Sequence, residues 1–208
     1  MPARAASVTV ALTGASGMLY GLRLIECLVQ AGTRISLVYS QAAHIVAKQE
    51  LDLVLPPRAT DAERYFTERY KAAPGQLRAY GREDWYSPVA SGSNTNDAMV
   101  ICPCTTGTLA SIAAGISDNL IERAADVTLK ERRTLVLVVR ETPFSVLHLE
   151  NMLKLAHAGA VILPANPGFY TRPTSIDQVI DFIVSRVLDQ IGIPNTLMAR
   201  WGRDDAGG

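Results

Sequence analysis

The sequence predicts a single α/β domain in which one parallel sheet is flanked by helices. Short apolar runs alternate with segments of helical periodicity, and such βαβ units give parallel sheets with right-handed crossovers. The run at residues 135–139 is apolar at every position, as in a central strand covered on both faces. The length of 208 residues suits one domain. We expect it to span residues 1–200, followed by a disordered polar tail at residues 201–208.

Each predicted strand is a short apolar run, and each predicted helix repeats apolar residues at helical spacing. The strands are expected at residues 8–13, 35–39, 98–102, 135–139 and 160–163. The helices are expected at residues 18–31, 41–50, 61–71, 106–115, 119–130, 149–158 and 176–190. Gly14, Pro103 and Pro164 stop three of the strands, and Asp118 and Ser175 are the expected N-caps of two helices. Outside its one helix, the stretch 51–93 reads as a long loop, which is often functional.

Composition argues against several classes of partner. Lys plus Arg equals Asp plus Glu at 20 each, so the basic excess of a nucleic-acid binder is missing. A formal net charge of zero also suits a subunit that covers surface in an oligomer. No apolar segment approaches the ~20 residues that span a bilayer, and the run at residues 8–12 is too short for a signal peptide. We therefore expect a cytoplasmic protein.

The cysteines and histidines do not predict a metal site or a catalytic base. Cys27, Cys102 and Cys104 lack the spacing of a disulfide framework. The Cys102-Pro103-Cys104 motif has no second pair and no nearby His, so we expect small buried residues rather than zinc ligands. The histidines all fall in helical patterns, where we expect packed or exposed side chains: His44, His148 and His157.

Polar, loop-forming residues follow four of the predicted strands. They are the Gly14-Ala15-Ser16-Gly17 run, Ser40, the Thr105-Thr106-Gly107-Thr108 run and Arg140-Glu141-Thr142. The carboxyl ends of parallel strands meet at one edge of the sheet, and ligands bind there. Helix N-termini present free N–H groups and partial positive charge at such loops. Each run alone is an ordinary turn or cap, but together they predict a site for a phosphate-bearing ligand.

Charged residues crowd the stretch 121–133. A solvated helix face with i,i+4 ion pairs, such as Asp126 with Lys130, accounts for most of them. Arg123 and Lys130 are seven residues apart, so they share a helix face and could both point at one anion.

Taken together, these residues resemble those of the UbiX-type flavin prenyltransferase family, within the superfamily of flavin-containing cysteine-decarboxylase-like flavoproteins. The likeness covers nearly the whole chain. Its motifs lie at residues 13–17 with Tyr20-Gly21, 90–93, 102–104, 119–127 with 129–133, 140–143, 151–154 and 164–170. The resemblance implies a flavodoxin-like, Rossmann-type domain assembled as a homododecamer, with FMN at subunit interfaces.

The resemblance also implies a reaction. The dimethylallyl group of dimethylallyl monophosphate joins N5 and then C6 of reduced FMN, and phosphate is released without a metal. The prenylated FMN would serve a UbiD-type decarboxylase, in ubiquinone biosynthesis or in aromatic-acid decarboxylation. The sequence does not identify that decarboxylase, and it does not decide between a monophosphate and a diphosphate donor.

Position by position, the resemblance implies three groups of site residues. The FMN contacts are Gly14, Ala15, Ser16, Ser40, Thr105, Thr106, Gly107, Thr108 and Arg140, with Ser16 near N5. Some family members have Ser at the position of Thr105, and both residues offer a hydroxyl. The clamp on the donor phosphate is Arg123, Lys130, Tyr170 and Arg186, the last two from a neighbouring subunit. Trp85 is an aromatic wall, and Glu50 and Glu141 are the acidic groups of the active site.

A metal-free route agrees with the residues present. Enzymes that place a prenyl diphosphate on magnesium use paired Asp-rich motifs, and the Asp204-Asp205 pair has no second pair. Cationic groups such as Arg123 and Lys130 could stabilise the leaving phosphate instead. Glu50 could shuttle a proton during closure at C6.

Two other functions fit the same fold. A flavin-dependent cysteine decarboxylase would use a catalytic His and a Pro-Ala-Met-Asn motif, whereas residues 164–167 read Pro-Ala-Asn-Pro. A non-catalytic FMN carrier would leave the basic residues Arg123, Lys130 and Arg186 unexplained.

Overall fold

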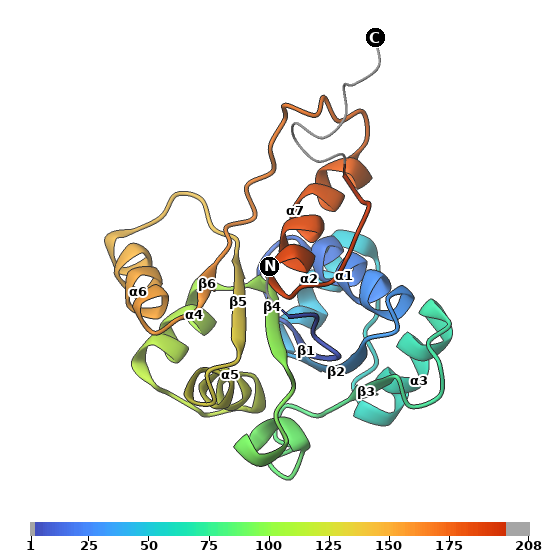
Figure 1. Cartoon of the computed structure of the whole chain (residues 1–208), viewed down its shortest axis with the longest axis vertical. Coiled ribbons are helices and arrows are strands. Elements are labelled where there is room, and N and C mark those ends of the chain that lie inside the picture. Colours follow the sequence, from blue (N-terminus) through green and yellow to red (C-terminus); the bar gives the residue numbers. More distant parts are fainter. Residues whose placement is uncertain (1–2, 199–208) are drawn as a thin grey trace.

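The computed structural model describes residues 3–198, so the predicted tail at 201–208, with Asp204-Asp205, lies outside the described residues. Six parallel strands form one sheet in the order β3-β2-β1-β4-β5-β6 (Figure 1). The strands are β1 (Ser7–Leu12), β2 (Arg34–Tyr39), β3 (Leu77–Ala79), β4 (Ala98–Cys104), β5 (Thr134–Val139) and β6 (Val161–Ile162). The order reverses between β1 and β4, as in Rossmann-type doubly wound sheets. The predicted α/β class with a parallel sheet is confirmed.

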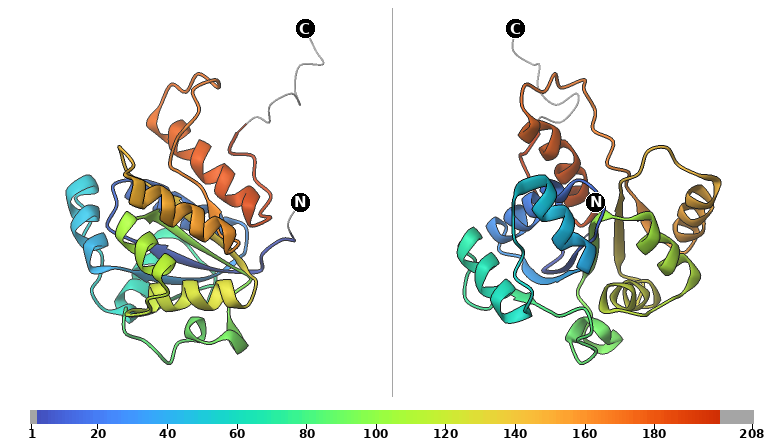
Figure 2. Two further views of the ribbon diagram at one scale, coloured as in Figure 1. Left: turned by 90° about the vertical axis from the view of Figure 1, so that its left-hand side faces the viewer. Right: turned by 180° about the vertical axis from the view of Figure 1, so that it is seen from behind.

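Helices cover both faces of the sheet, as Figure 2 shows from two further sides. They are α1 (Met18–Gln30), α2 (Gln41–Leu51), α3 (Ala59–Tyr70), α4 (Thr106–Ala114), α5 (Leu120–Lys130), α6 (Val146–His157) and α7 (Ile176–Gln190), with the 3-10 turns η1 (Pro88–Ala90) and η2 (Gly92–Asn94). Helices α1, α2, α3 and α7 pack in one apolar cluster with the sheet, and α4, α5 and α6 pack in a second.

Central strands contribute to both clusters. In β4, Val100 and Cys102 join the cluster under α1 and α7, whereas Met99 and Ile101 join the cluster under α4 and α5. Successive side chains of a strand point to opposite faces, so a strand with helices on both sides is apolar throughout. The same constraint explains the apolar run of β5, which was predicted.

Two of the predicted boundaries are wrong for identifiable reasons. Strand β4 does not end at Cys102 but continues through Pro103 to Cys104, and its register with β5 shifts between Ile101 and Cys104. Such an irregularity accommodates a proline, which has no N–H for the ladder. Helix α6 starts at Val146 rather than residue 149, because Ser145 and His148 close a capping box at its N-terminus.

The stretch 51–93 holds more structure than was predicted. Besides α3, it contains the short strand β3, which pairs with β2 and adds an edge to the sheet. Three residues are too few to show a strand period, so the sequence gives no signal for β3. The segment then returns under α5 through η1 and η2.

The cysteines are buried and free, as predicted for Cys102 and Cys104. Burial raises the pKa of Cys27 to about 11 and that of Cys104 to about 12. Because the thiolate is the nucleophile, these groups are unreactive near neutral pH. No helix within residues 3–198 is long and apolar enough to cross a membrane.

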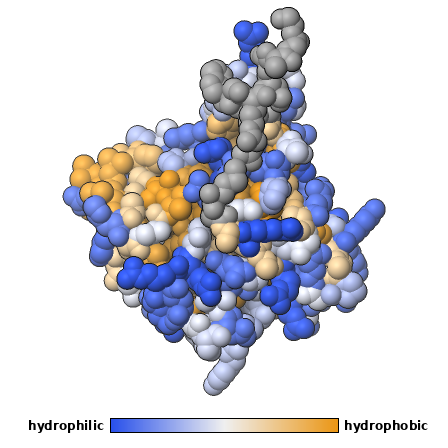
Figure 3. Space-filling view, viewed as in Figure 1, coloured by the Kyte–Doolittle hydropathy of each residue, from blue (hydrophilic) through white to orange (hydrophobic). Residues whose placement is uncertain are grey.

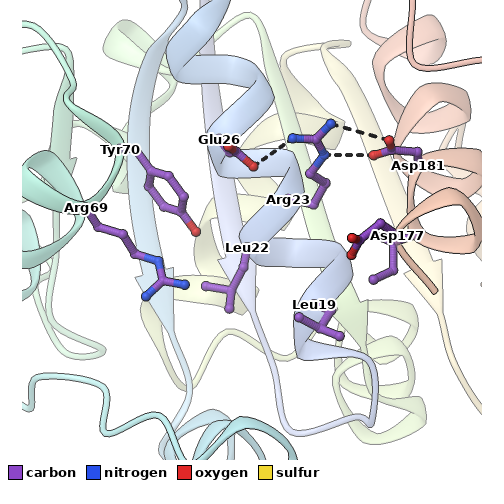
Figure 4. A pocket seen from close by; sticks show the side chains of 9 residues that line it. Leu19, Leu22, Arg23, Glu26, Arg69, Tyr70, Asp177 and Asp181 are labelled. Atoms are coloured by element: carbon purple, nitrogen blue, oxygen red, sulfur yellow. Dashed lines mark hydrogen bonds and ion pairs between the residues drawn. The ribbon is translucent and has the colours of Figure 1, made fainter. Parts of the chain in front are cut away.

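Helix α1 is fixed between the sheet and α7. A Cβ on Gly21 would collide with the carbonyl oxygen of Cys102, so α1 lies directly against β4. On its other side, Arg23 Nε donates to Asp181 Oδ1 of α7 at 2.7 Å, and Arg23 Nη1 donates to Glu26 Oε2 at 2.8 Å (Figure 4). The tip of β1 and the loop that follows it are therefore held in place.

The close approach at Gly21 gives a test of this packing. At an exposed helix position, replacing glycine by alanine stabilises the helix by about 1 kcal/mol. At Gly21 we expect the opposite: Gly21→Ala should lower the free energy of unfolding by about 1–3 kcal/mol, because the added methyl group collides with the β4 backbone. Urea denaturation measures the change. The control is Gly81→Ala, since a Cβ on Gly81 has no neighbour within 4 Å among the described residues. Unfolding of Gly21→Ala at or above the wild-type urea midpoint would contradict the packing.

Candidate active site

The carboxyl ends of β1, β2 and β4 open into a cavity of about 410 Å³. Four residues predicted to contact a phosphate-bearing ligand line it together: Gly14, Ser40, Thr105 and Thr108. A Cβ on Gly14 would collide with Ala42, so the loop after β1 lies against the first turn of α2. The structure thus brings three separate strand ends to one place, as the parallel topology predicts.

Three helices point their N-termini at this cavity. Their N-cap residues, Ser40 for α2, Thr105 for α4 and Asn119 for α5, all line it. Ser40 Oγ accepts from Ala43 N at 3.2 Å, and Thr105 Oγ1 accepts from Thr108 N at 3.0 Å. Partial positive charge from three helix dipoles therefore adds up in one hollow, which suits a phosphate group.

Asn119 was missed as a site residue because Asp118 was the predicted cap. Asn119 Oδ1 accepts from Ile121 N at 3.0 Å and from Glu122 N at 3.2 Å. Asp118 instead donates its backbone N–H to Glu122 Oε2 at 2.8 Å. Adjacent Asp and Asn are equally good caps by type, so sequence alone could not choose between them.

A buried threonine fixes the distance between two of the strand ends. Thr13 Oγ1 donates to Pro103 O at 2.7 Å and accepts from Thr105 N at 2.9 Å. Thr13 is 1% exposed, so water does not compete for these bonds. The hydroxyl thereby ties the end of β1 to the turn between β4 and α4.

Glu50 lies next to the loop that holds Ser16. Its carboxylate accepts from Gly17 N at 3.0 Å and from Met18 N at 3.0 Å. Gly17 is the N-cap of α1 and has no side chain to serve as a cap, so Glu50 supplies the acceptor from α2. In this loop Ala15 is buried, whereas Ser16 is exposed.

Arg140 follows β5 at the same edge of the sheet. Its Nε is buried and has no hydrogen-bond partner among the described residues. A buried guanidinium nitrogen without an acceptor is costly, so this atom fits a residue whose partner is a ligand. Glu141, beside it, accepts from Thr142 N at 3.1 Å through its side chain. Thr106 and Gly107 form the first turn of α4, where Gly107 is exposed.

Arg123 and Lys130 lie elsewhere, on the face of α5 that meets η1 and η2. Arg123 Nε donates to Ala90 O at 3.1 Å, and a Cβ on Gly92 would contact Lys130 Nζ. They share a helix face, as predicted. The suggested Asp126–Lys130 pair is wrong, because Asp126 accepts from Arg123 Nη1 at 2.8 Å.

Lys130 instead pairs with its neighbour Glu131, and this hydrogen bond lowers the pKa of the Glu131 carboxyl. Neither Arg123 nor Lys130 lines the cavity at the strand tips. Lys130 ends α5, roughly 16 Å along the helix from the N-cap at the cavity.

The remaining predicted residues also lie apart from the cavity. The Tyr170 ring packs edge-on against Phe182, with centroids 5.8 Å apart, and Arg186 Nη1 donates to Asp189 Oδ2 at 3.0 Å. Trp85 is 45% exposed in the loop before η1. Within one protomer, the predicted FMN contacts and the predicted phosphate clamp are therefore not one site.

A larger cavity, of about 550 Å³, lies between α1, α3 and α7, where Arg23 and Tyr70 are among its lining residues (Figure 4). It contains none of the predicted site residues. Within residues 3–198, no three His, Cys, Asp or Glu side chains are grouped as a metal site would require.

The doubly wound fold and a cavity suited to a phosphate define a Rossmann-type ligand-binding protein, and the comparisons specify the class. The chain matches the flavoprotein family over residues 2–188, and it belongs to that family. More particularly, it is 55% identical to the flavin prenyltransferase UbiX of Pseudomonas aeruginosa, over 94% of this chain and 93% of that protein. The resemblance indicated by the motifs is confirmed.

Solved structures agree with this likeness. AnUbiX (PadA1), determined in complex with FMN and dimethylallyl pyrophosphate, superposes with a TM-score of 0.85 at 39% identity, over 97% of this chain and 100% of that chain. A dodecameric FMN-dependent UbiX-like decarboxylase from Escherichia coli gives a TM-score of 0.82 at 36% identity, over 94% and 98% of the two chains. The peptidyl-cysteine decarboxylase EpiD matches at 14% identity with a TM-score of 0.56, over 89% and 97%, which shows the fold alone.

The cap at the cavity can be tested on its own. We expect Thr105→Ala to lower the free energy of unfolding by about 1 kcal/mol, because the N–H of Thr108 loses its acceptor. Thr105→Ser keeps the hydroxyl and should lose clearly less. Urea denaturation of both variants provides the measurement. Equal losses in the two variants would assign the effect to the methyl group rather than to the cap.

Proposed function

We propose that this protein is a flavin prenyltransferase that joins a dimethylallyl group to N5 and C6 of reduced FMN. The observation that carries the proposal is the cavity at the strand tips, where the N-termini of α2, α4 and α5 meet beside Gly14 and hydroxyl side chains. A phosphate is the group that such a cavity accommodates best. The 55% identity to a flavin prenyltransferase then specifies the reaction.

The cavity and its surroundings fit FMN. Ser40, Thr105 and Thr108 line the cavity and would offer hydroxyls to the FMN phosphate. Arg140 Nε, which has no partner within residues 3–198, offers a donor to the flavin at the tip of the strand next to β4. Ser16 is exposed on the loop after β1, where it could lie near N5. When bound in its reduced form, the flavin supplies the nucleophile, so the protein mainly positions and stabilises.

The donor phosphate requires several cations, and the predicted clamp residues of one protomer do not line the cavity. We assign the binding of the donor phosphate to Arg123 and Lys130 on α5, with Tyr170 and Arg186 from a neighbouring subunit. Arginine and lysine would balance the charge that the leaving phosphate gains, and the tyrosine would donate a hydrogen bond. Trp85 would offer its ring face to the allyl cation. The donor in this proposal is dimethylallyl monophosphate.

The surface supports assembly into an oligomer, and a dodecamer is the form we propose. Helix α6 exposes a row of apolar side chains, which form the hydrophobic patch over α6 in Figure 3: Val146, Leu147, Leu149 and Leu153. Each is at least 52% exposed, and an apolar patch of this kind is typical of a subunit interface. The dodecameric relative from Escherichia coli supports the same number of subunits.

Product mass tests the reaction directly. We expect the protein, incubated without oxygen with reduced FMN and dimethylallyl monophosphate, to yield flavin heavier by one five-carbon unit, as measured by mass spectrometry. A parallel incubation with the diphosphate identifies the preferred donor. Flavin of unchanged mass with both donors would contradict the proposal. It would favour an FMN carrier, or a cysteine decarboxylase to be assayed with cysteine substrates.

Glu50 has a separate expected effect. We propose that its carboxylate takes up the proton that leaves C6 during ring closure, so Glu50→Gln should stall after the bond to N5 has formed. The amide oxygen of Gln can still accept from Gly17 N, which keeps the cap of α1. Mass spectrometry with the absorption spectrum would detect the open form. Ring closure at the wild-type rate would remove Glu50 from the proton transfer.

The product, prenylated FMN, would be handed to a UbiD-type decarboxylase, in ubiquinone biosynthesis or in the decarboxylation of aromatic acids. We place the reaction in the cytoplasm, which agrees with three free, buried cysteines.

A further inference from the structure

The cavity at the strand tips is lined by one charged residue, which the sequence motifs did not single out. Arg82, in the loop between β3 and η1, lines it together with the N-caps of α2, α4 and α5. Arg82 also lines a smaller neighbouring cavity of about 180 Å³, beside Tyr39 and His44. Arg82 therefore lies at the boundary between the two cavities.

The backbone of Arg82 is anchored on both sides. Its carbonyl oxygen accepts from Leu120 N, the first residue of α5, at 2.8 Å. Two residues earlier, Tyr80 N donates to Leu37 O of β2 at 2.9 Å. These bonds fix the position of the Arg82 Cα relative to the N-terminus of α5 and the end of β2, and they do not depend on which side chain residue 82 carries.

The guanidinium of Arg82, in contrast, has no partner in the described part of the chain. No hydrogen bond or ion pair joins it to any residue of the described range 3–198, although Glu83 and Asp84 follow it in the chain. Other arginines of the protein do hold carboxylates: Arg23, Arg64, Arg123 and Arg186. Arg82 is exposed, so water solvates it in this state, and its donors remain available to a ligand.

The charge around Arg82 identifies the ligand group. Among the described residues that line the cavity, Arg82 is the sole charged side chain, and no carboxylate balances it. Three helix N-termini add further positive potential in the same space. Positive potential of this kind attracts an anion, and a guanidinium binds a phosphate through two parallel N–H donors.

We propose that Arg82 is a phosphate-binding residue for FMN, which neutralises the phosphate end of the flavin in the cavity at the strand tips. This assignment rests on the proposed function. The lining favours the phosphate over the flavin ring, because the N-caps of three helices meet in it and no aromatic side chain among the described residues lines it. The donor phosphate has separate cations, Arg123 and Lys130, at η1 and η2.

Comparison of FMN with riboflavin, which lacks the phosphate, tests the assignment. Each flavin is titrated into the assembled protein, and the Kd is taken from flavin fluorescence. We expect Arg82→Gln to raise the Kd for FMN about tenfold and to leave the Kd for riboflavin within about twofold. Arg82→Lys should lie in between, because it keeps the charge and loses the paired donors.

Arg78→Gln is the matched control. Arg78 is an exposed arginine on the same segment that does not line the cavity, so its variant should leave both Kd values unchanged. An unchanged Kd for FMN in Arg82→Gln, or an equal rise for both flavins, would overturn the assignment. Failure of the proposed function is a different result, namely that wild-type protein forms no five-carbon adduct. Adduct formation with an unchanged ratio of the two Kd values overturns the role of Arg82 alone.

Discussion

The hydroxyl of Thr13 is the constraint on which the site depends. It donates to the carbonyl of Pro103 and accepts from the N–H of Thr105, so one buried group joins the tips of β1 and β4. At this point the strand order reverses, and the crossovers leave the sheet in opposite directions. The loops after the two strands must diverge there, and a hollow results. The bridge sets its width, because the loop of Gly14 and the cap of α4 both start from it.

Electrostatics then determine what the hollow can hold. The caps of α2, α4 and α5 are neutral side chains, so they satisfy N–H groups without cancelling the helix dipoles. At α1 the cap is the carboxylate of Glu50, which offsets the positive end of that helix. Positive potential therefore gathers where a phosphate would lie, and an ionisable acceptor sits beside the loop that carries Ser16. In the proposed reaction, the same helix-terminus chemistry would serve phosphate binding at the cavity and acid–base chemistry at Glu50.

The residues proposed to bind FMN and those proposed to bind the donor phosphate lie on distant surfaces of one protomer. The cavity lies at the strand tips, the pair Arg123 and Lys130 lies against η1 and η2, and Tyr170 packs on α7. Such a division has a physical explanation if protomers meet at these surfaces. The apolar side chains on α6 supply a reason for association, since burying them removes apolar area from water. An oligomer would then be part of the catalytic apparatus.

The sequence by itself determined the α/β class, the strands of the sheet core, the polar strand tips and the flavin prenyltransferase motifs, because hydrophobic period and turn chemistry are local properties. It could not supply β3, which is too short to show a period, or choose Asn119 over Asp118 as a cap. Tertiary structure alone decided that Glu50 caps α1 and that Arg82 reaches the cavity. Both depend on how segments distant in the chain pack together, and no local pattern encodes such a contact.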